Sequence, residues 1–349
     1  MGEIRVAVAG VGNCCSALLQ GIEYYRNNGK LGLIHRSVGG YDAGDLKIVT
    51  AFDIDTGKIG RDIAEAIYAE PNKAPRFVEV RKKGVEVLMG PTPDSLDKGN
   101  MSHITKAAAD PVDVAETLRN NKVDVLVNLI SGGSDKASRE YAEACVEAGC
   151  AFLNATPSGI VNDIMLASAF KRAGQPLAGD DLLSQMGATA VHMGLLEFLD
   201  SRGVHIDESY QLDVGGGSES IDTLEKTRDT KRQIKTEAVK SSLRYDFPLV
   251  SGSADFVDFL VNGRDSFFYF KGTYFGGAGF TMDVKLSTED APNSGAVLMD
   301  VIRGLKVASD RGIGGPVEQV CAYGFKRPPV RRKLPEAYKW FMEFTEGHP

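Results

Sequence analysis

The amino-acid sequence predicts an α/β fold, a doubly wound parallel sheet that carries an inserted α+β domain. Short apolar runs alternate with helical patterns over the first half, a period of two replaces them after Gly187, and the helical period returns from Pro292. Near-continuous apolar strands between helices indicate a parallel sheet covered on both faces. Strands with a period of two indicate a sheet with one covered face, which is typically antiparallel.

The first half of the chain is expected to build the parallel sheet. Apolar runs predict strands at residues 4–9, 46–52, 85–89, 123–130, 151–153 and 176–178. Apolar residues at helical spacing predict helices at about 14–25, 59–67 and 135–148 between them.

The middle of the chain is expected to form the inserted domain. A helix is predicted over about 188–199, and Gly203 closes it. Alternating apolar residues predict strands around 210–214 and 280–286, and 266–275 is an aromatic-rich strand. The helical stretch 219–240 is highly charged, and we interpret it as a solvated helix face.

The last part of the chain is expected to return to the first domain. Pro292-Asn293-Ser294 is a helix start, an apolar stripe follows it, and Gly312 ends the helix. A final helix carries Trp340, Phe341 and Phe344. We therefore predict one domain from residues 1–186 plus 292–349 and an inserted domain from residues 187–291.

Composition excludes several classes of protein. The chain has 349 residues, enough for about two domains, and a net charge of −7, which argues against a nucleic-acid partner. The sequence contains no apolar run of about 18 residues, so no membrane span is expected. The first residues enter a strand without a signal-peptide pattern. The five Cys are odd in number and the five His show no metal spacing, so we expect reduced thiols, a cytoplasmic location and no metal.

A glycine turn between the first strand and the first helix predicts a dinucleotide site. Gly10 permits the tight turn, and Gly12 lets a pyrophosphate approach the helix N-terminus, although Cys15 stands where a third glycine is usual. Asp53 ends the second strand, where an acid binds the adenosine ribose and favours NAD over NADP. The predicted cofactor-binding residues here are Gly10, Val11, Gly12, Asn13, Cys14, Asp53 and Ile54.

Further candidates follow later strands of the parallel sheet, where ligands bind in such folds. Ser131, Gly132, Ser134, Ala155, Asp180 and Asp181 are predicted to reach the cofactor. Gln185, Gly187 and Thr189 open a helix whose N–H groups and hydroxyls suit a phosphate. Small residues and paired acids also cap helices without any ligand, so each motif alone leaves that alternative open. His192 lacks a second metal ligand at i+4, and we interpret it as structural.

Several blocks taken together resemble one family. These are Ala9-Gly10-Val11-Gly12-Asn13-Cys14, Gly179-Asp180-Asp181-Leu182, Ser184-Gln185-Met186-Gly187-Ala188-Thr189, Asp290-Ala291-Pro292-Asn293-Ser294 and Ala322-Tyr323-Gly324-Phe325-Lys326. Their residues and order are similar to the short bacterial type of inositol-phosphate synthase, and the resemblance spans almost the whole chain.

The resemblance implies an NAD-binding Rossmann-like domain with an inserted domain that carries the active site and the contacts of a homotetramer. It implies an isomerase that acts on glucose 6-phosphate in three steps. NAD oxidises C5, the C6 enolate attacks the C1 aldehyde, and the same NADH reduces C5. By the resemblance, Lys326, Asp290 and Lys235 match catalytic positions, and Thr156 and Ser158 match positions of a phosphate loop.

Departures from the family pattern leave the substrate open. Leu183 stands where the family has a lysine, Arg264 falls on a second lysine and joins the catalytic candidates, and 213–219 reads Asp-Val-Gly-Gly-Gly-Ser-Glu. The resemblance therefore extends to the family's variant cyclases of carbocyclic-nucleoside pathways, which convert fructose 6-phosphate into a cyclopentane. A simple dehydrogenase, and a protein that binds NAD and a sugar phosphate without turnover, also remain open.

Overall fold

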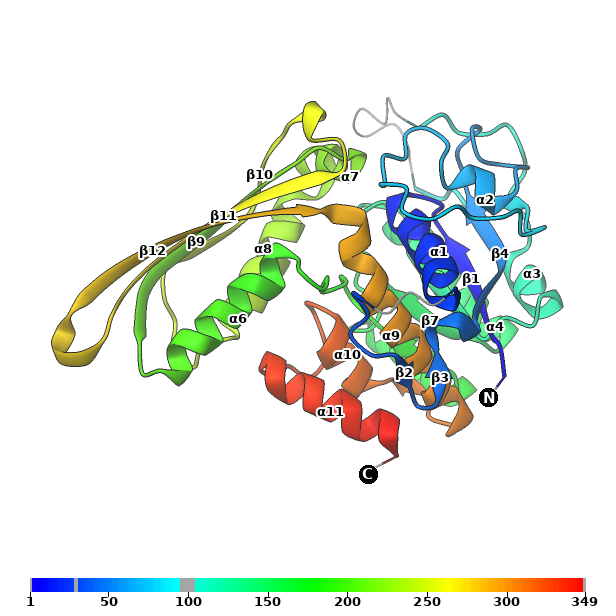
Figure 1. Ribbon diagram of the computed structural model, residues 1–349. Coiled ribbons are helices and arrows are strands. Elements are labelled where there is room, and N and C mark those ends of the chain that lie inside the picture. The colour runs from blue at the N-terminus through cyan, green and yellow to red at the C-terminus, as the bar shows by residue number, and fades with distance from the viewer. Residues whose placement is uncertain (1, 28–30, 95–103, 348–349) are drawn as a thin grey trace.

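A computed structural model describes residues 2–27, 31–94 and 104–347 of the chain. Its larger layer is a parallel sheet of seven strands in the order β13-β8-β7-β6-β1-β4-β5 (Figure 1). The strands are β1 (Ile4–Ala9), β4 (Leu46–Asp53), β5 (Val87–Met89), β6 (Val125–Asn128), β7 (Ala151–Asn154), β8 (Pro176–Ala178) and β13 (Gly315–Pro316). The strand order changes direction at β1, so the carboxyl end of β1 is where such sheets bind ligands.

Helices cover the parallel sheet on both faces. They are α1 (Asn13–Arg26), α2 (Ile63–Ala66), α3 (Val114–Asn120), α4 (Asp135–Ala148), α5 (Ile164–Ala173), α9 (Asp290–Asp310), α10 (Glu318–Gly324) and α11 (Leu334–Glu346). Helix α9 packs against α1 and against β6, β7 and β8 of the parallel sheet. The predicted α/β fold with a doubly wound parallel sheet is confirmed. No helix among the described residues is long and apolar enough to cross a membrane.

A second sheet of four strands projects from the first, in the order β10-β9-β11-β12 (Figure 1). Its strands are β9 (His205–Gly215), β10 (Leu249–Phe256), β11 (Gly263–Thr273) and β12 (Gly279–Glu289). The sheet is mixed, because β9–β11 and β11–β12 are antiparallel whereas β10 runs parallel to β9. The three strands predicted from the sequence pair antiparallel as expected, whereas β10 lies outside those predictions and joins β9 in parallel through the crossover helices between them.

Helix α6 (Ala188–Ser201) and the segment α7 (Ser218–Asp222), η2 (Thr223–Thr227, a π-helical turn) and α8 (Arg228–Lys240) cover one face of this sheet. A second core forms there from Leu196, Ile206, Ala238, Phe268 and Phe270. The smaller elements are β2 (Ser37–Val38), β3 (Tyr41–Asp42), η1 (Ala43–Asp45), η3 (Asp258–Leu260) and η4 (Phe275–Gly277).

Two expectations about the second sheet need correction. On β9 the apolar Tyr210 and Leu212 lie on the uncovered face, 38% and 39% exposed, while the polar Gln211 and Asp213 are buried beneath the helices. The charged stretch 219–240 is not simply a solvated face, because Thr227 and Lys235 are buried. Of these buried polar residues, Asp213 and Lys235 line a cavity.

Candidate active site

The glycine turn after β1 is shaped by close backbone packing. Gly10 has φ +91°, and a Cβ there would lie 2.8 Å from backbone atoms of Leu129 and Ile130, so only glycine fits. Gly12 is the N-cap of α1, and a Cβ on it would meet no described atom within 4 Å. The first turn of α1 therefore opens onto free space with its N–H groups available to an anion.

Asp53 lies beside this turn at the end of β4. Its Oδ2 accepts the Val11 N–H at 2.7 Å, and its Oδ1 accepts the N–H groups of Ile54 at 2.7 Å and Asp55 at 3.0 Å. The carboxylate thus braces the glycine turn at the end of β4. We call the hollow at this turn the cofactor groove; Gly10, Gly12, Asn13, Asp53, Ile54, Lys58, Asn72, Ser131 and Ser134 are among its lining residues.

The groove fits a dinucleotide. The empty space in front of Gly12 is the place that a larger side chain would fill, and a carboxylate lies at the end of the neighbouring strand. Val11 itself is fully buried and contributes through its backbone. Cys14, Gly132, Ala155 and Asp181 line a second hollow instead, which we call the reaction cavity.

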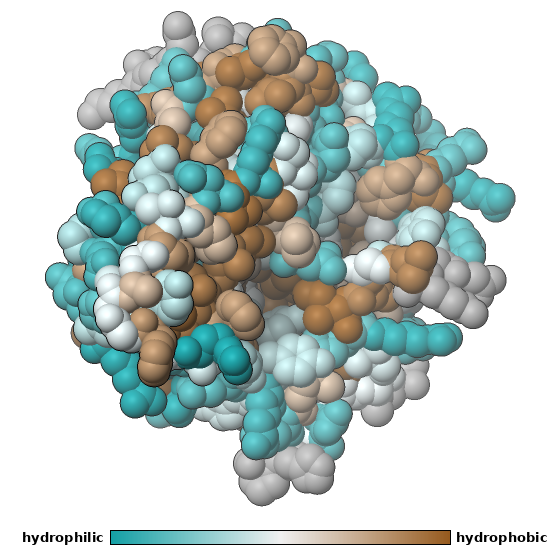
Figure 2. All heavy atoms as spheres, turned by 60° about the vertical axis from the view of Figure 1, so that its left-hand side comes forward, coloured by the Kyte–Doolittle hydropathy of each residue, from teal (hydrophilic) through white to brown (hydrophobic). Residues whose placement is uncertain are grey.

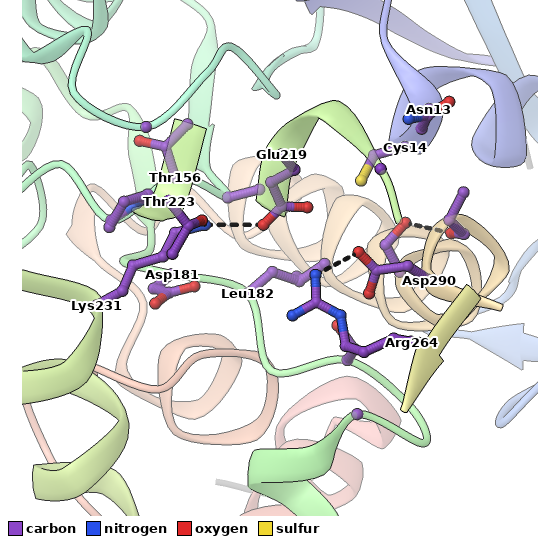
Figure 3. A pocket seen from close by; sticks show the side chains of 18 of the residues that line it. Asn13, Cys14, Thr156, Asp181, Leu182, Glu219, Thr223, Lys231, Arg264 and Asp290 are labelled. Atoms are coloured by element: carbon purple, nitrogen blue, oxygen red, sulfur yellow. Dashed lines mark hydrogen bonds and ion pairs between the residues drawn. The ribbon is translucent and has the colours of Figure 1, made fainter. Parts of the chain in front are cut away.

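The reaction cavity adjoins the cofactor groove, since both are lined by Gly12, Asn13, Leu129, Ile130 and Ser131. It lies between the two sheets, where α1, the loops after β7 and β8, the helical segment 218–240, β11 and α9 converge (Figure 3). A ligand in the cavity would therefore lie next to the inner end of a ligand in the groove.

Charged side chains enter this cavity as ion pairs. The pairs are Lys231 with Glu219 at 2.8 Å, Lys235 with Asp213 at 2.6 Å, Arg264 with Asp290 at 2.8 Å and Lys326 with Asp181 at 2.8 Å. Figure 3 shows Arg264 and Asp290 facing each other across from Lys231 and Glu219. The structure thus brings together the predicted Lys326, Asp290, Lys235 and Arg264 in one cavity.

The surroundings shift the pKa values of these groups in different directions. Burial lowers the pKa of Lys235, and the Asp213 carboxylate only partly opposes it. Burial alone would lower the pKa of Lys231, but Glu219 and Asp181 raise it overall. Burial also raises the pKa of Asp290 in spite of the Arg264 guanidinium. The cavity therefore combines an amine that loses its proton more readily with cations that stay charged.

Two polar atoms of the cavity lack a partner among the described residues. They are Oδ2 of Asp181 and Nε of Arg264, and both are buried. Asp181 also has a left-handed backbone, with φ 59°, held by its N–H to the Thr156 carbonyl and by the Lys326 N–H to its own carbonyl. Buried polar atoms without partners in a cavity are places for a ligand to bond.

The predicted phosphate residues are only partly brought together. Thr156, Gly187 and Thr189 line the reaction cavity. Helix α6 begins there on Gly187, and no described side chain caps it. Ser158 instead donates to Asp135 at 2.6 Å, and Gln185 donates to the Gly32 carbonyl at 2.9 Å. Neither is among the residues that line the two described cavities.

Asp180 also lies away from both cavities. It is fully buried and accepts from Asn154 Nδ2 at 2.8 Å and from the Ile160 N–H at 3.0 Å. Burial raises its pKa to about 6. Its contacts hold the loop after β7, so it supports Thr156 without lining the two described cavities.

Sequence reasoning missed Glu219 and Lys231 as site residues. A signal was present, because Lys231 and the predicted Lys235 are four residues apart and must share one helix face. Asn262 was also missed; its carbonyl accepts the Asp290 N–H and its Oδ1 accepts the Ala291 N–H, both at 2.9 Å. Among the described residues no cluster of three His, Cys, Asp or Glu side chains could hold a metal.

Comparisons with known proteins match this chain over almost its full length. A family model described as myo-inositol-1-phosphate synthase matches residues 187–291. The chain is 41% identical over 347 residues to the inositol-3-phosphate synthase of Corynebacterium glutamicum, covering 95% of each chain. It is 41% identical over 358 residues to that of Mycolicibacterium smegmatis, covering 99% of each.

Solved structures are similar too. The structure of Ari2 has a TM-score of 0.80 and 32% identity, covering 99% of both chains. A myo-inositol-1-phosphate synthase-related protein from Thermotoga maritima also has a TM-score of 0.80, at 21% identity over 99% of this chain and 98% of the other, which supports the fold.

Proposed function

Because the chain belongs to the inositol-3-phosphate synthase family, we propose that it is an isomerase, a sugar-phosphate cyclase that uses and regenerates NAD. The observation that carries the proposal is that the cofactor groove adjoins the reaction cavity, which gathers paired lysines, an arginine and carboxylates. A cyclase needs a redox cofactor beside a site that can move protons and stabilise an oxyanion.

NAD is the cofactor that we propose for the groove. The first turn of α1 in front of Gly12 would hold the pyrophosphate, and Asp53 would accept from the adenosine ribose. When bound, NAD would take a hydride from the sugar and later return it. Asn13 and Ser131 line both hollows and would lie at the nicotinamide end.

The residues of the cavity divide into donors and proton carriers. Arg264 stays charged at all working pH values, so its role is to donate to a developing oxyanion. Lys235 loses its proton more readily because it is buried, so it suits the transfer of a proton. Lys326, held by Asp181, is the second proton carrier, and Asp290 orients Arg264. The sugar phosphate would bind at the N-terminus of α6, near Gly187, Thr189 and Thr156.

Glucose 6-phosphate is the substrate that the family assignment favours, with an inositol phosphate as product. Fructose 6-phosphate, closed to a five-membered ring, is the second candidate. One observation favours it: Leu183 lines the cavity with an apolar side chain and packs into the second core, so it brings no donor to the substrate. Cyclisation onto a ketone places the attacked oxygen differently from cyclisation onto an aldehyde, and small displacements cost large factors in rate.

The test incubates the wild type and Leu183→Lys with NAD and each hexose phosphate, and identifies products by NMR. A cyclised product with no net NADH supports the cyclase. Accumulating NADH would show a dehydrogenase, and binding without conversion of either sugar would show a protein without turnover. Conversion of glucose 6-phosphate alone by the wild type would refute fructose 6-phosphate as the substrate.

We also propose that the chain works as a homotetramer in the cytoplasm, with residues 187–291 as an inserted unit and 1–186 plus 292–349 as the cofactor-binding unit. The uncovered face of the four-stranded sheet supports self-association. Tyr210, Leu212, Val250 and Phe267 are all exposed on it, and Tyr210 stacks on Tyr269 with ring centroids 5.3 Å apart. Figure 2 shows hydrophobic side chains gathered on the side of the molecule where this sheet projects. The five cysteines are unpaired, in keeping with a reducing compartment.

A further inference from the structure

A hydrogen-bonded series of buried polar side chains leads from the second core to Lys235. His192 on α6 has its Nδ1 3.2 Å from Gln211 Oε1. Gln211 Nε2 donates to both oxygens of Asp213, at 3.0 and 2.9 Å. Asp213 Oδ2 then accepts from Lys235 Nζ at 2.6 Å. Asp213 and Lys235 line the reaction cavity, whereas His192 and Gln211 lie behind it, fully buried.

Stability alone does not explain this series of polar side chains. A buried polar group without partners costs about 1–3 kcal/mol, and a bonded one contributes little net stability. The rings of Phe268 and Phe270 meet His192 edge-on, at centroid distances of 5.6 and 5.1 Å, so part of its surroundings is apolar. The polar side chains are best explained by what they hold at the cavity end.

The hydrogen positions follow from the partners. Burial lowers the pKa of His192 to about 4, so near neutral pH the imidazole is uncharged and carries one hydrogen. The Asp213 carboxylate only accepts, so Gln211 turns its NH₂ to Asp213 and its oxygen to His192. The imidazole hydrogen is therefore on Nδ1.

Nε2 of the imidazole faces Ser209. The Ser209 Oγ lies 2.9 Å from Nε2 and 2.6 Å from the Tyr269 carbonyl oxygen. Its single hydrogen serves the carbonyl in one rotamer and Nε2 in the other. The imidazole thus joins a neutral hydroxyl on one side to the amide that bonds Asp213 on the other.

The charges around Lys235 show why the position of Asp213 matters. Lys235 lies on α8, Asp213 faces it from β9, Arg264 from β11, and Lys326 from the loop after α10, while Lys231 is one turn away on α8. Arg264, Lys326 and burial all disfavour a charge on Lys235, and Asp213 opposes them. If the Asp213 carboxylate turned away, the amine would lose its proton at a lower pH and its position would loosen.

We propose that His192 and Gln211 are positioning residues: the imidazole orients the Gln211 amide, and the amide holds the Asp213 carboxylate against Lys235. The catalytic consequence rests on the proposed function, because it requires Lys235 to act on the substrate. The positioning itself is a property of the protein alone and is measurable without turnover.

Matched variants at one position separate positioning from packing. In His192→Asn the amide nitrogen lies near the place of Nδ1 and can still donate to Gln211. In His192→Gln the amide reaches instead toward the place of Nε2 and Ser209. His192→Phe removes both contacts. Gln211→Met removes the hydrogen bonds that join His192 to Asp213. Melting temperatures identify the variants that fold.

The first readout is the titration of Lys235, followed by NMR on the full chain with lysines labelled at Cε. The Lys235 signal is assigned by its loss in Lys235→Met. We expect the midpoint of His192→Asn to match the wild type. In His192→Gln, His192→Phe and Gln211→Met we expect it to fall by about one pH unit, a tenfold change in the proton equilibrium.

The second readout is turnover of the hexose phosphates. We expect kcat to fall about 10- to 100-fold in the variants with a shifted midpoint, with KM nearly unchanged, because a misplaced group slows the chemical step. An unchanged Lys235 midpoint in His192→Gln and Gln211→Met, or equal behaviour of His192→Asn and His192→Gln, would overturn the proposal. If the wild type turns over neither sugar, the proposed function fails, and the titration still decides the positioning.

Discussion

At the scale of single residues, the loss of Lys326 should impair both the chemistry and the stability of the fold. Its Nζ donates to Asp181 Oδ1 inside the reaction cavity. We expect Lys326→Met to lower cyclisation by about 10²–10⁴-fold, the usual contribution of a positioned acid–base group. The variant also leaves the Asp181 carboxylate buried without its cation, which can cost about 3–5 kcal/mol.

A double variant distinguishes the two effects of Lys326. Lys326→Met with Asp181→Asn removes the stranded charge, so its melting temperature should recover while activity stays low. Lys333→Met breaks a more exposed pair with Asp200 and is the control that should keep activity. Restored turnover in the double variant would remove Lys326 from the mechanism.

Asp53 should set the choice between the two dinucleotides. An additional phosphate on the ribose would meet this carboxylate, so NAD should bind at least about tenfold more tightly than NADP, a difference of about 1.4 kcal/mol. Asp53→Ala should reduce this difference in affinity between NAD and NADP. The substitution should also weaken the binding of NAD, because Asp53 Oδ2 accepts a hydrogen bond from the Val11 N–H of the glycine turn. Calorimetry with both dinucleotides measures this, and equal affinities in the wild type would contradict it.

His192 should make the stability of the fold sensitive to acid. Its pKa is about 4 in the folded chain and 6.5 without burial, so the unfolded chain binds more protons between these values. The contribution of His192 to stability should therefore fall as the pH drops from about 6.5 to 4, by about 3 kcal/mol. Denaturant unfolding at several pH values should show a shallower fall in His192→Asn. If the unfolding free energies of the two proteins changed with pH in parallel, the pKa of His192 would not be lowered by folding.

At the scale of elements, the buried Arg303 of α9 forms hydrogen bonds with the backbone of residues 35–41. Its Nη2 bonds Asp300 at 2.6 Å and the His35 carbonyl at 3.0 Å, and its Nη1 bonds the carbonyls of Arg36 and Tyr41. Asp300 also accepts from Tyr323 on α10 at 2.6 Å, three residues before Lys326. Arg303→Met should cost about 3–5 kcal/mol, because it strands several buried acceptors.

The measurement for Arg303 is urea unfolding beside a surface control. Arg119→Met breaks an exposed pair with Glu147 and should cost less than about 1 kcal/mol. Arg303→Lys keeps the positive charge but not the several N–H donors of the guanidinium. Its loss of unfolding free energy should therefore lie between those of the other two variants. A loss in Arg303→Met no larger than in Arg119→Met would show that the cluster contributes little.

Elements of the parallel sheet were predictable because apolar strands and capped helices carry local signals. Buried strands such as β1 and β7 were predicted within one residue of their observed bounds. The faces of β9 were not predictable, because its buried side serves a polar cavity and its apolar side stays uncovered. Likewise, the side of α8 that enters the cavity is charged, and charge in a sequence ordinarily indicates solvent. The parallel pairing of β10 depends on a crossover that leaves no local pattern.

At the scale of the candidate site, the sequence supplied the residues but not their pairing. The glycine turn, Asp53 and the cavity residues Asp290 and Lys326 were found from motifs and from a resemblance. The carboxylate of Asp213 against Lys235 joins residues 22 positions apart, and no local pattern indicates it. Ser158, Gln185 and Asp180 stand in motifs that look alike in sequence, yet their side chains bond the protein itself.

At the scale of the whole molecule, strand β9 would connect the proposed self-association to the active site. Leu212 lies on the uncovered face of β9, between Gln211 and Asp213, which point toward Lys235 on the other face. A second copy packed on Leu212 would therefore hold rigid the strand that positions Asp213. Exposed apolar faces of this kind mark interaction surfaces.

We expect Leu212→Lys to shift the assembly from a tetramer to smaller species, because a buried ammonium without a partner is costly at an interface. Light scattering after gel filtration measures the mass. Ile164→Lys, at an exposed apolar residue at the start of α5, is the matched control and should leave the mass unchanged. Turnover should fall in Leu212→Lys and recover in part at high protein concentration, since association restores the packing behind β9. A monomeric wild type, or a dissociated variant with full activity at every concentration, would show that the cavity needs no second copy.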